Sequence, residues 1–90
     1  MEKLYLEIYV DKKLKNTFDD EDLCMNTLTE FLWRTSVLKQ KHVKVKYKYN
    51  YNDLQKVSFI ESYIDNNDNI TKIEYRFYNV PTKCGYLNIR

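Results

Sequence analysis

Residues 42–51 limit most strongly what this chain can fold into, because their side chains alternate between two chemical types. One side of the alternation holds apolar and aromatic residues: Val43, Val45, Tyr47, Tyr49 and Tyr51. The other side holds three lysines and an asparagine: Lys44, Lys46, Lys48 and Asn50. A period of two is typical of a β-strand with one buried and one solvated face. The sequence therefore predicts a strand here, with a row of lysines on its solvated side.

A helix is predicted before this strand, from the acidic run at residues 19–22 to about Leu38. Asp19 takes the expected N-cap position, and Phe18 and Leu23 have the spacing of a hydrophobic staple. The acids of the run lie where the helix dipole favours negative charge. The predicted buried stripe consists of Cys24, Leu28, Phe31, Thr35 and Leu38, with Leu32 at its flank.

Further strands are predicted on both sides of this helix. Alternation over residues 4–10 predicts the first strand, and residues 14–17 predict its return after a turn. Residues 57–65 and 70–80 predict two more strands, joined by a turn rich in Asp and Asn. The apolar side of residues 57–65 stays open between two sets, Val57, Phe59 and Tyr63 or Ile60 and Ile64. A last edge strand is predicted at residues 86–90.

These elements predict the fold class. Consecutive strands with short turns pair antiparallel, and one amphipathic helix then covers one face of the sheet. We expect an α+β fold with one antiparallel sheet of four to five strands and a single helix packed on one face, in the order β(β)αβββ(β). The 90 residues are the length of one domain, so residues 1–90 are expected to form a single compact unit.

Composition and charge bear on the source and the partner of the chain. Lys, Asn, Tyr, Ile and Phe make up 40 of the 90 residues, and their codons are rich in A and T, which is typical of low-GC bacteria, their phages and large DNA viruses. The net charge is +2, but residues 1–38 carry −3 and residues 39–90 carry +5. The chain has no signal-peptide-like segment or apolar run long enough to span a membrane, so we expect a cytoplasmic protein without a membrane partner.

Residues for catalysis or metal binding are few. The single histidine, His42, has no other histidine at ligand spacing, and Cys24 and Cys84 form no CxxC pair. A nucleophilic pair of either cysteine with His42 is the one enzymatic alternative. Glu61 and Glu74 fall on adjacent predicted strands, where we expect them to meet in a salt-bridge ladder with the neighbouring bases Lys72 and Arg76. We expect no enzyme, no catalytic residue, no cofactor and no metal.

The row of Lys44, Lys46 and Lys48 is the strongest candidate for partner binding. Lysines about 6.6 Å apart on one strand face suit contacts with successive phosphates. An acidic protein surface is a second candidate ligand, and a solvated edge strand whose lysines prevent aggregation is the purely structural alternative. The neighbouring tyrosines are predicted on the opposite face, which argues against base stacking beside these lysines.

Trp33 and the acidic run are the other candidate contacts. Trp33 falls almost opposite the buried helix stripe, where it is either an interface anchor or a residue packed under the chain terminus or a loop. The acids can imitate phosphates or simply start the helix. The predicted partner-binding residues are Lys44, Lys46, Lys48, Trp33, Asp19, Asp20, Glu21 and Asp22.

Two functions follow as hypotheses. The first is a small phage, viral or mobile-element protein that binds a protein or a protein–nucleic acid complex and inhibits or adapts it, as anti-CRISPR proteins do with defence nucleases. The alternative is direct binding of nucleic acid by the lysine strand. Exposed strand edges leave both a monomer and a homodimer open.

Overall fold

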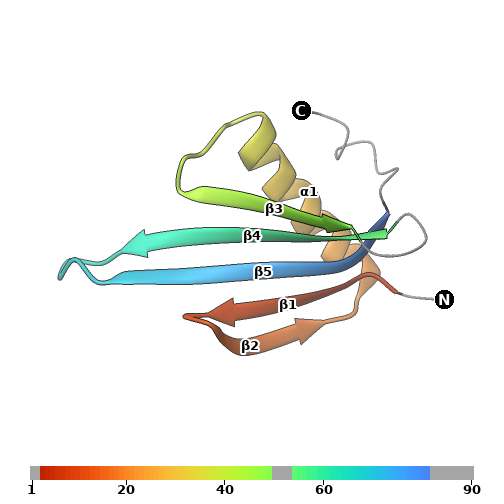
Figure 1. The fold of residues 1–90 in the computed structure, drawn as a ribbon, viewed down its shortest axis with the longest axis horizontal. Coiled ribbons are helices and arrows are strands. Elements are labelled where there is room, and N and C mark those ends of the chain that lie inside the picture. The colour runs from red at the N-terminus through yellow and green to blue at the C-terminus, as the bar shows by residue number, and fades with distance from the viewer. Residues whose placement is uncertain (1–2, 50–53, 82–90) are drawn as a thin grey trace.

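The structure is a computed structural model that describes residues 3–49 and 54–81, with side chains described up to Lys46 in the first range. Its elements are β1 (Tyr5–Val10), β2 (Lys13–Phe18), α1 (Glu21–Ser36), β3 (Val43–Tyr49), β4 (Leu54–Ile64) and β5 (Ile70–Pro81). The five strands form one sheet in the order β2-β1-β5-β4-β3, and every neighbouring pair is antiparallel. The helix crosses behind this sheet in Figure 1, so the predicted α+β class is confirmed. The predicted strand at residues 86–90 lies outside the described residues.

The first hairpin is closed by a two-residue turn. Asp11 and Lys12 both have positive φ, 48° and 71°, as a type I′ turn requires, although neither is a glycine. The carboxylate of Asp11 accepts a hydrogen bond from the backbone N–H of Lys72 at 3.0 Å, which ties the turn to β5. The returning strand β2 confirms the predicted strand at residues 14–17 and extends it by one residue on each side.

The helix begins one residue later than predicted. Asp20, not Asp19, is the N-cap, and its carboxylate accepts hydrogen bonds from the backbone N–H groups of Asp22 and Leu23. Both aspartates suit a cap, and spacing alone favoured the wrong one. The shift also removes the predicted staple, because Leu23 is exposed while Phe18 packs against the core. The helix ends at Ser36, so Leu38 lies beyond it and is exposed.

The core lies between α1 and the sheet. Phe31 of the helix stacks on Phe59 of β4 with ring centroids 4.9 Å apart, and Phe59 meets the edge of Phe77 of β5 at 5.8 Å. Phe59 and its strand neighbour Val57 are fully buried. This packing settles the open question in β4: the set with Val57 and Phe59 faces the helix, and the set with Ile60 does not. The predicted helix stripe is confirmed for Cys24, Leu28, Phe31 and Leu32.

The helix covers one face of the sheet only. Strand residues whose side chains point away from α1 form what we call the open face, which is turned toward the viewer in Figure 1. The two edges of the sheet are β2 and β3, so the lysine strand is an edge strand. Within it Val43 is buried while Lys44 and Lys46 are exposed, as the alternation predicts. Among the described residues, no helix is both long and apolar enough to cross a membrane.

Candidate functional site

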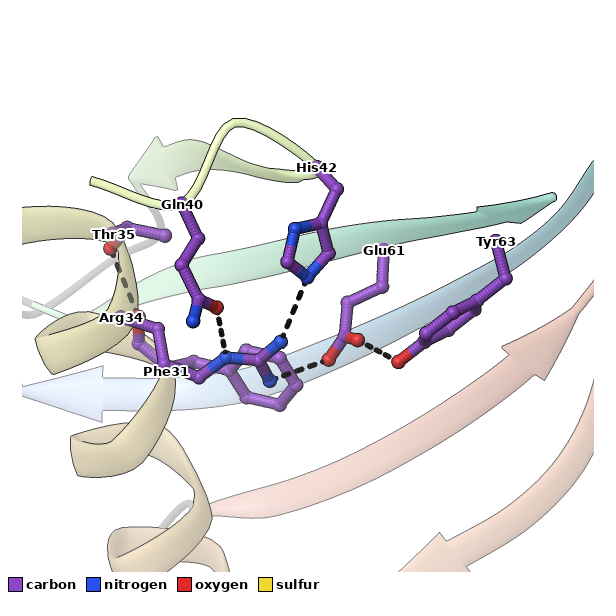
Figure 2. A network of polar contacts seen from close by, with 7 residues as sticks. All are labelled: Phe31, Arg34, Thr35, Gln40, His42, Glu61 and Tyr63. Atoms are coloured by element: carbon purple, nitrogen blue, oxygen red, sulfur yellow. Dashed lines mark hydrogen bonds and ion pairs between the residues drawn. The ribbon is translucent and has the colours of Figure 1, made fainter. Parts of the chain in front are cut away.

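A polar network fastens the C-terminal end of α1 to the sheet (Figure 2). Arg34 of the last helical turn donates from Nη1 to Oε1 of Glu61 in β4 at 2.7 Å, and from Nε to the side-chain oxygen of Gln40 at 2.7 Å. Its Nη2 lies 3.3 Å from Nε2 of His42. The hydroxyl of Tyr63 donates to the second carboxylate oxygen of Glu61. Three residues, Gln40, His42 and Tyr63, thus surround one guanidinium–carboxylate pair.

The electrostatics of this network favour a charged Glu61. Glu61 is 2% exposed, and this burial alone raises the pKa of its carboxyl. The hydrogen bonds from Arg34 and Tyr63 outweigh burial, so the pKa ends below its ordinary value. Because a guanidinium can only donate, a hydrogen bond at this contact needs Nε2 of His42 as its acceptor. The guanidinium carbon also lies 5.0 Å from the centre of the Phe31 ring.

The network is closed on itself, which favours a structural role. Both oxygens of Glu61 accept a hydrogen bond, and the Arg34 donors are shared among three partners. A satisfied buried network of this kind fixes one arrangement of the elements that it joins. Sequence reasoning missed it because Arg34 and Glu61 are 27 residues apart. The only sequence signal was the position of Glu61, an acid that falls on the same side of the strand as the apolar residue Phe59.

The predicted meeting of Glu61 with Glu74 is wrong, and the alternative pair of Cys24 with His42 is separated along the helix. Glu61 pairs with Ile73 and faces the helix, whereas Glu74 pairs with Ile60 on the open face, so the two carboxylates lie on opposite faces of the sheet. Only Glu74 and Arg76 form the expected ion pair, at 3.0 Å. Cys24 is buried in the first turn of α1, about 15 Å of helix from the turn of Arg34 that contacts His42. Cys84 lies outside the described residues.

The open face gathers cations from three neighbouring strands. Strand register places Lys44 beside Ile60 and Glu74, and Lys46 beside Ser58 and Arg76. Directly opposite residues of antiparallel strands share a face. The bases assembled in this way are Lys44, Lys46, Lys56, Lys72 and Arg76. The acids beside them are Glu74 of β5 and Glu7 of the adjacent β1, so these five bases and two acids together carry a charge of +3.

The acids on this face are engaged locally. Glu74 pairs with Arg76, and Glu7 accepts a hydrogen bond from the hydroxyl of Tyr9 at 3.2 Å. The two ion pairs of the described residues are Arg76–Glu74 and Arg34–Glu61, so no carboxylate there neutralises Lys44 or Lys46. The hydrogen bond to Glu74 raises the pKa of Arg76, which keeps this cation charged. Among the described residues, the lysines of the open face, Lys44, Lys46, Lys56 and Lys72, therefore form no ion pair.

Three tyrosines share the open face with these cations. Tyr5 of β1 and Tyr78 of β5 stack with centroids 4.5 Å apart and planes at 9°. The guanidinium carbon of Arg76 lies 4.0 Å from the centre of the Tyr9 ring. Burial, followed by the nearby Glu7, raises the pKa of Tyr78 to about 12. The sequence analysis considered only the tyrosines of the lysine strand itself, whereas Tyr5, Tyr9 and Tyr78 come from β1 and β5.

The predicted partner-binding residues lie in three separate places. Lys44 and Lys46 are on the open face; Lys48 belongs to the same strand, but its side chain lies outside the described part. Trp33, 49% exposed, is on the outer side of the helix, behind the sheet. The four acids, Asp19, Asp20, Glu21 and Asp22, are all exposed at the start of the helix, where Asp20 acts as its cap. The structure does not bring these groups together into one surface.

Within residues 3–49 and 54–81, no three His, Cys, Asp or Glu side chains are grouped closely enough to hold a metal ion. Comparison of the chain with protein-family models, with curated proteins and with solved structures gave no match.

Proposed function

We propose that this chain is a binding protein rather than an enzyme, and that its open face binds nucleic acid. One observation carries the proposal: three adjacent strands place Lys44, Lys46, Lys56, Lys72 and Arg76 on one side of the sheet. Phosphate contacts by lysine and arginine supply most of the affinity of proteins for nucleic acid. The partial neutralisation by Glu7 and Glu74 limits the charge but leaves the β3 edge basic.

Salt dependence tests this proposal. If all five cations contact phosphates, the log–log slope of affinity against salt is about −3.5 for single strands and −4.5 for duplex DNA. The affinity should then fall roughly 100- to 500-fold between about 50 and 200 mM salt. Labelled random DNA and RNA, titrated with the purified protein at both salt concentrations, give this slope.

Charge reversal on the β3 edge locates the contact. Lys44→Glu with Lys46→Glu should weaken binding strongly and reduce the salt slope by about 2. Lys13→Glu with Lys15→Glu is the matched control, because it makes the same change of net charge on exposed residues of the opposite edge strand, β2. Equal losses in the two variants would contradict a specific contact by the open face. Absence of binding at about 50 mM salt would end the proposal.

A protein partner is the second candidate function, and the outer face of the helix favours it. Trp33 and Val37, the C-cap of α1, lie four residues apart at the end of the helix, and both are exposed. Exposed tryptophans are frequent anchors of protein interfaces. A phage or viral protein that inhibits a defence nuclease would use such an anchor. Trp33→Ala should then weaken inhibition of that purified nuclease, and unchanged inhibition by the folded variant would argue against the anchor.

A further inference from the structure

We infer that the ligand of the open face is an unpaired stretch of DNA or RNA, with one base stacked on Tyr5. This inference rests on the proposed function and specifies its ligand class. Its evidence is the combination of aromatic rings and cations on one face, which single-stranded binding surfaces use together. Bases stack on the rings, while lysines and arginines contact the phosphates between them.

The rings and cations of the open face form a row across three strands. Lys56 of β4 places its ammonium 5.1 Å from the centre of the Tyr78 ring. Tyr78 in turn stacks on Tyr5 of β1 at 4.5 Å. The row therefore runs from β4 through β5 to β1, and Tyr78 has a neighbour from each of the two strands that flank β5. A base can join this row most directly at its Tyr5 end.

At the Tyr5 end of the row, the neighbouring strand β2 does not reach far enough to lie beside Tyr5. Strand β2 pairs with β1 from Leu6 to Val10, so no residue of β2 lies opposite Tyr5. A nucleobase is flat and of similar width to the phenol, and it can continue the stack at the spacing of aromatic pairs. Stacking of one base on an aromatic side chain contributes about 1–3 kcal/mol.

The width of the sheet argues against a duplex as the ligand. Five strands span about 19 Å from edge to edge, since neighbouring strands lie about 4.8 Å apart. The major groove of B-DNA is about 12 Å wide and admits a helix or a two-stranded ribbon, but not this face. In a duplex the faces of the bases are also covered by their neighbours, so Tyr5 would contribute nothing. An unpaired strand can satisfy both the β3 lysines and Tyr5, which lie about 14 Å apart across three strand spacings.

Fluorescence anisotropy with matched oligonucleotides tests the inference. The probes are a labelled 12-nucleotide single-stranded DNA, the RNA of the same sequence and the corresponding 12-base-pair duplex, each at 50 and 200 mM salt. We expect at least tenfold tighter binding of a single-stranded probe than of the duplex. The two single-stranded probes separate DNA from RNA as the preferred source of the unpaired bases.

Substitutions at Tyr5 separate stacking from charge. Tyr5→Leu should weaken single-strand binding by about 5- to 150-fold, the equivalent of one lost stacked base, without changing the salt slope. Tyr5→Phe keeps the ring and should bind like the wild type. Trp33→Leu removes an exposed aromatic on the opposite side of the molecule and should have no effect.

The outcomes distinguish this inference from the function on which it rests. Duplex binding as tight as single-strand binding, or equal affinities of Tyr5→Leu and Tyr5→Phe, would overturn the stacked single strand but leave nucleic-acid binding intact. No binding of any of the three probes at 50 mM salt would overturn both.

Discussion

At the scale of single residues, Glu61 is the most completely buried charged side chain among the described residues. Its carboxylate is almost completely removed from water, and an unpaired charge in such a place is strongly destabilising. The guanidinium of Arg34 and the hydroxyl of Tyr63 compensate for the lost hydration. The stability of the helix–sheet contact therefore depends on the protonation state of one side chain.

This dependence predicts a loss of stability in acid. The pKa of Glu61 is lower in the folded protein than in the unfolded chain, so the unfolded chain takes up the proton first. The stabilisation is present above the unfolded pKa, about 4.3, and is lost as the pH falls through the lower folded value. Urea unfolding between pH 7 and pH 2.5 should show this loss, and Glu61→Gln should show a flatter profile.

A second carboxylate serves as the reference for that experiment. Asp65 accepts hydrogen bonds from the backbone N–H groups of Asn69 and Asn67 in the β4–β5 turn, which lowers its pKa as well. Glu61→Gln should therefore retain part of the acid sensitivity, and Asp65→Asn should remove a different part. A Glu61→Gln profile parallel to that of the wild type would show that the Arg34 pair does not sense pH.

At the scale of elements, the start of α1 depends on one aspartate in a run of acids. Asp20 holds the extended backbone geometry of an N-cap and accepts from two of the N–H groups that the first turn leaves without helical partners. Its neighbours Asp19, Glu21 and Asp22 contribute charge near the helix dipole but accept none of these hydrogen bonds. The four acids therefore differ in what they contribute, although they look equivalent in sequence.

Alanine substitution separates these two contributions. Asp20→Ala should lower the free energy of unfolding by about 1 kcal/mol, the usual loss for an N-cap. Asp19→Ala removes the same charge from an exposed neighbour and should cost at most a few tenths of a kcal/mol. Urea denaturation followed by circular dichroism compares the two variants. A larger loss of unfolding free energy for Asp19→Ala than for Asp20→Ala would mean that Asp19 is the N-cap, as the sequence spacing predicted.

At the scale of the whole molecule, the strands differ in how completely they are enclosed. Strand β5 is the centre of the sheet and pairs with β4 along its length and with β1 from Ile73 to Tyr78, whereas β2 and β3 each have one neighbour. Core residues Phe77 and Val80 of β5 are fully buried. Exchange of a central strand amide therefore requires a more extensive opening than exchange at an edge.

Amide hydrogen exchange should rank the strands by this position. We expect the slowest exchange in β5 and in the parts of β1 and β4 that flank it, and the fastest in β2 and in the outward-facing N–H groups of β3. Exchange followed by two-dimensional NMR gives the rates residue by residue. Protection of the outward N–H groups of β3 as strong as that of β5 would mean that this edge is covered, for example by a second copy of the chain.

Local sequence patterns predicted the elements well, and long-range pairing explains what they missed. Alternation identified the β3 faces because Val43 and Lys44 differ so clearly in polarity. Alternation could not show which side of β4 is buried, because Glu61 interrupts the apolar set. The ion pair with Arg34 explains why this acid lies on the buried side. The strand order joins β1 to β5, a contact between distant parts of the sequence for which no local signal exists.

The aromatic part of the open face had a signal that sequence reasoning did not use. Tyr5 and Tyr9 alternate with the predicted buried residues of the first strand. Tyr78 directly follows Phe77, so these two side chains point to opposite faces of the sheet. A sheet with a single helix has one open face, so all such residues must share it with the lysines. Combining the outward sides of every strand would have placed these tyrosines beside Lys44 and Lys46, although their stacking depends on the strand order.

The position of β1 between β2 and β5 also has a consequence for how the chain folds. Tyr5 pairs with Tyr78, so the first strand cannot gain its second neighbour until the last described strand is present. Closing a loop of this length costs more entropy than forming any of the hairpins, and topologies rich in such contacts fold slowly. During synthesis the β1–β2 hairpin and α1 emerge well before β5, and meanwhile the apolar side of β1 lacks most of its partners. Nascent chains are therefore most exposed to aggregation in the interval that ends when β5 leaves the ribosome.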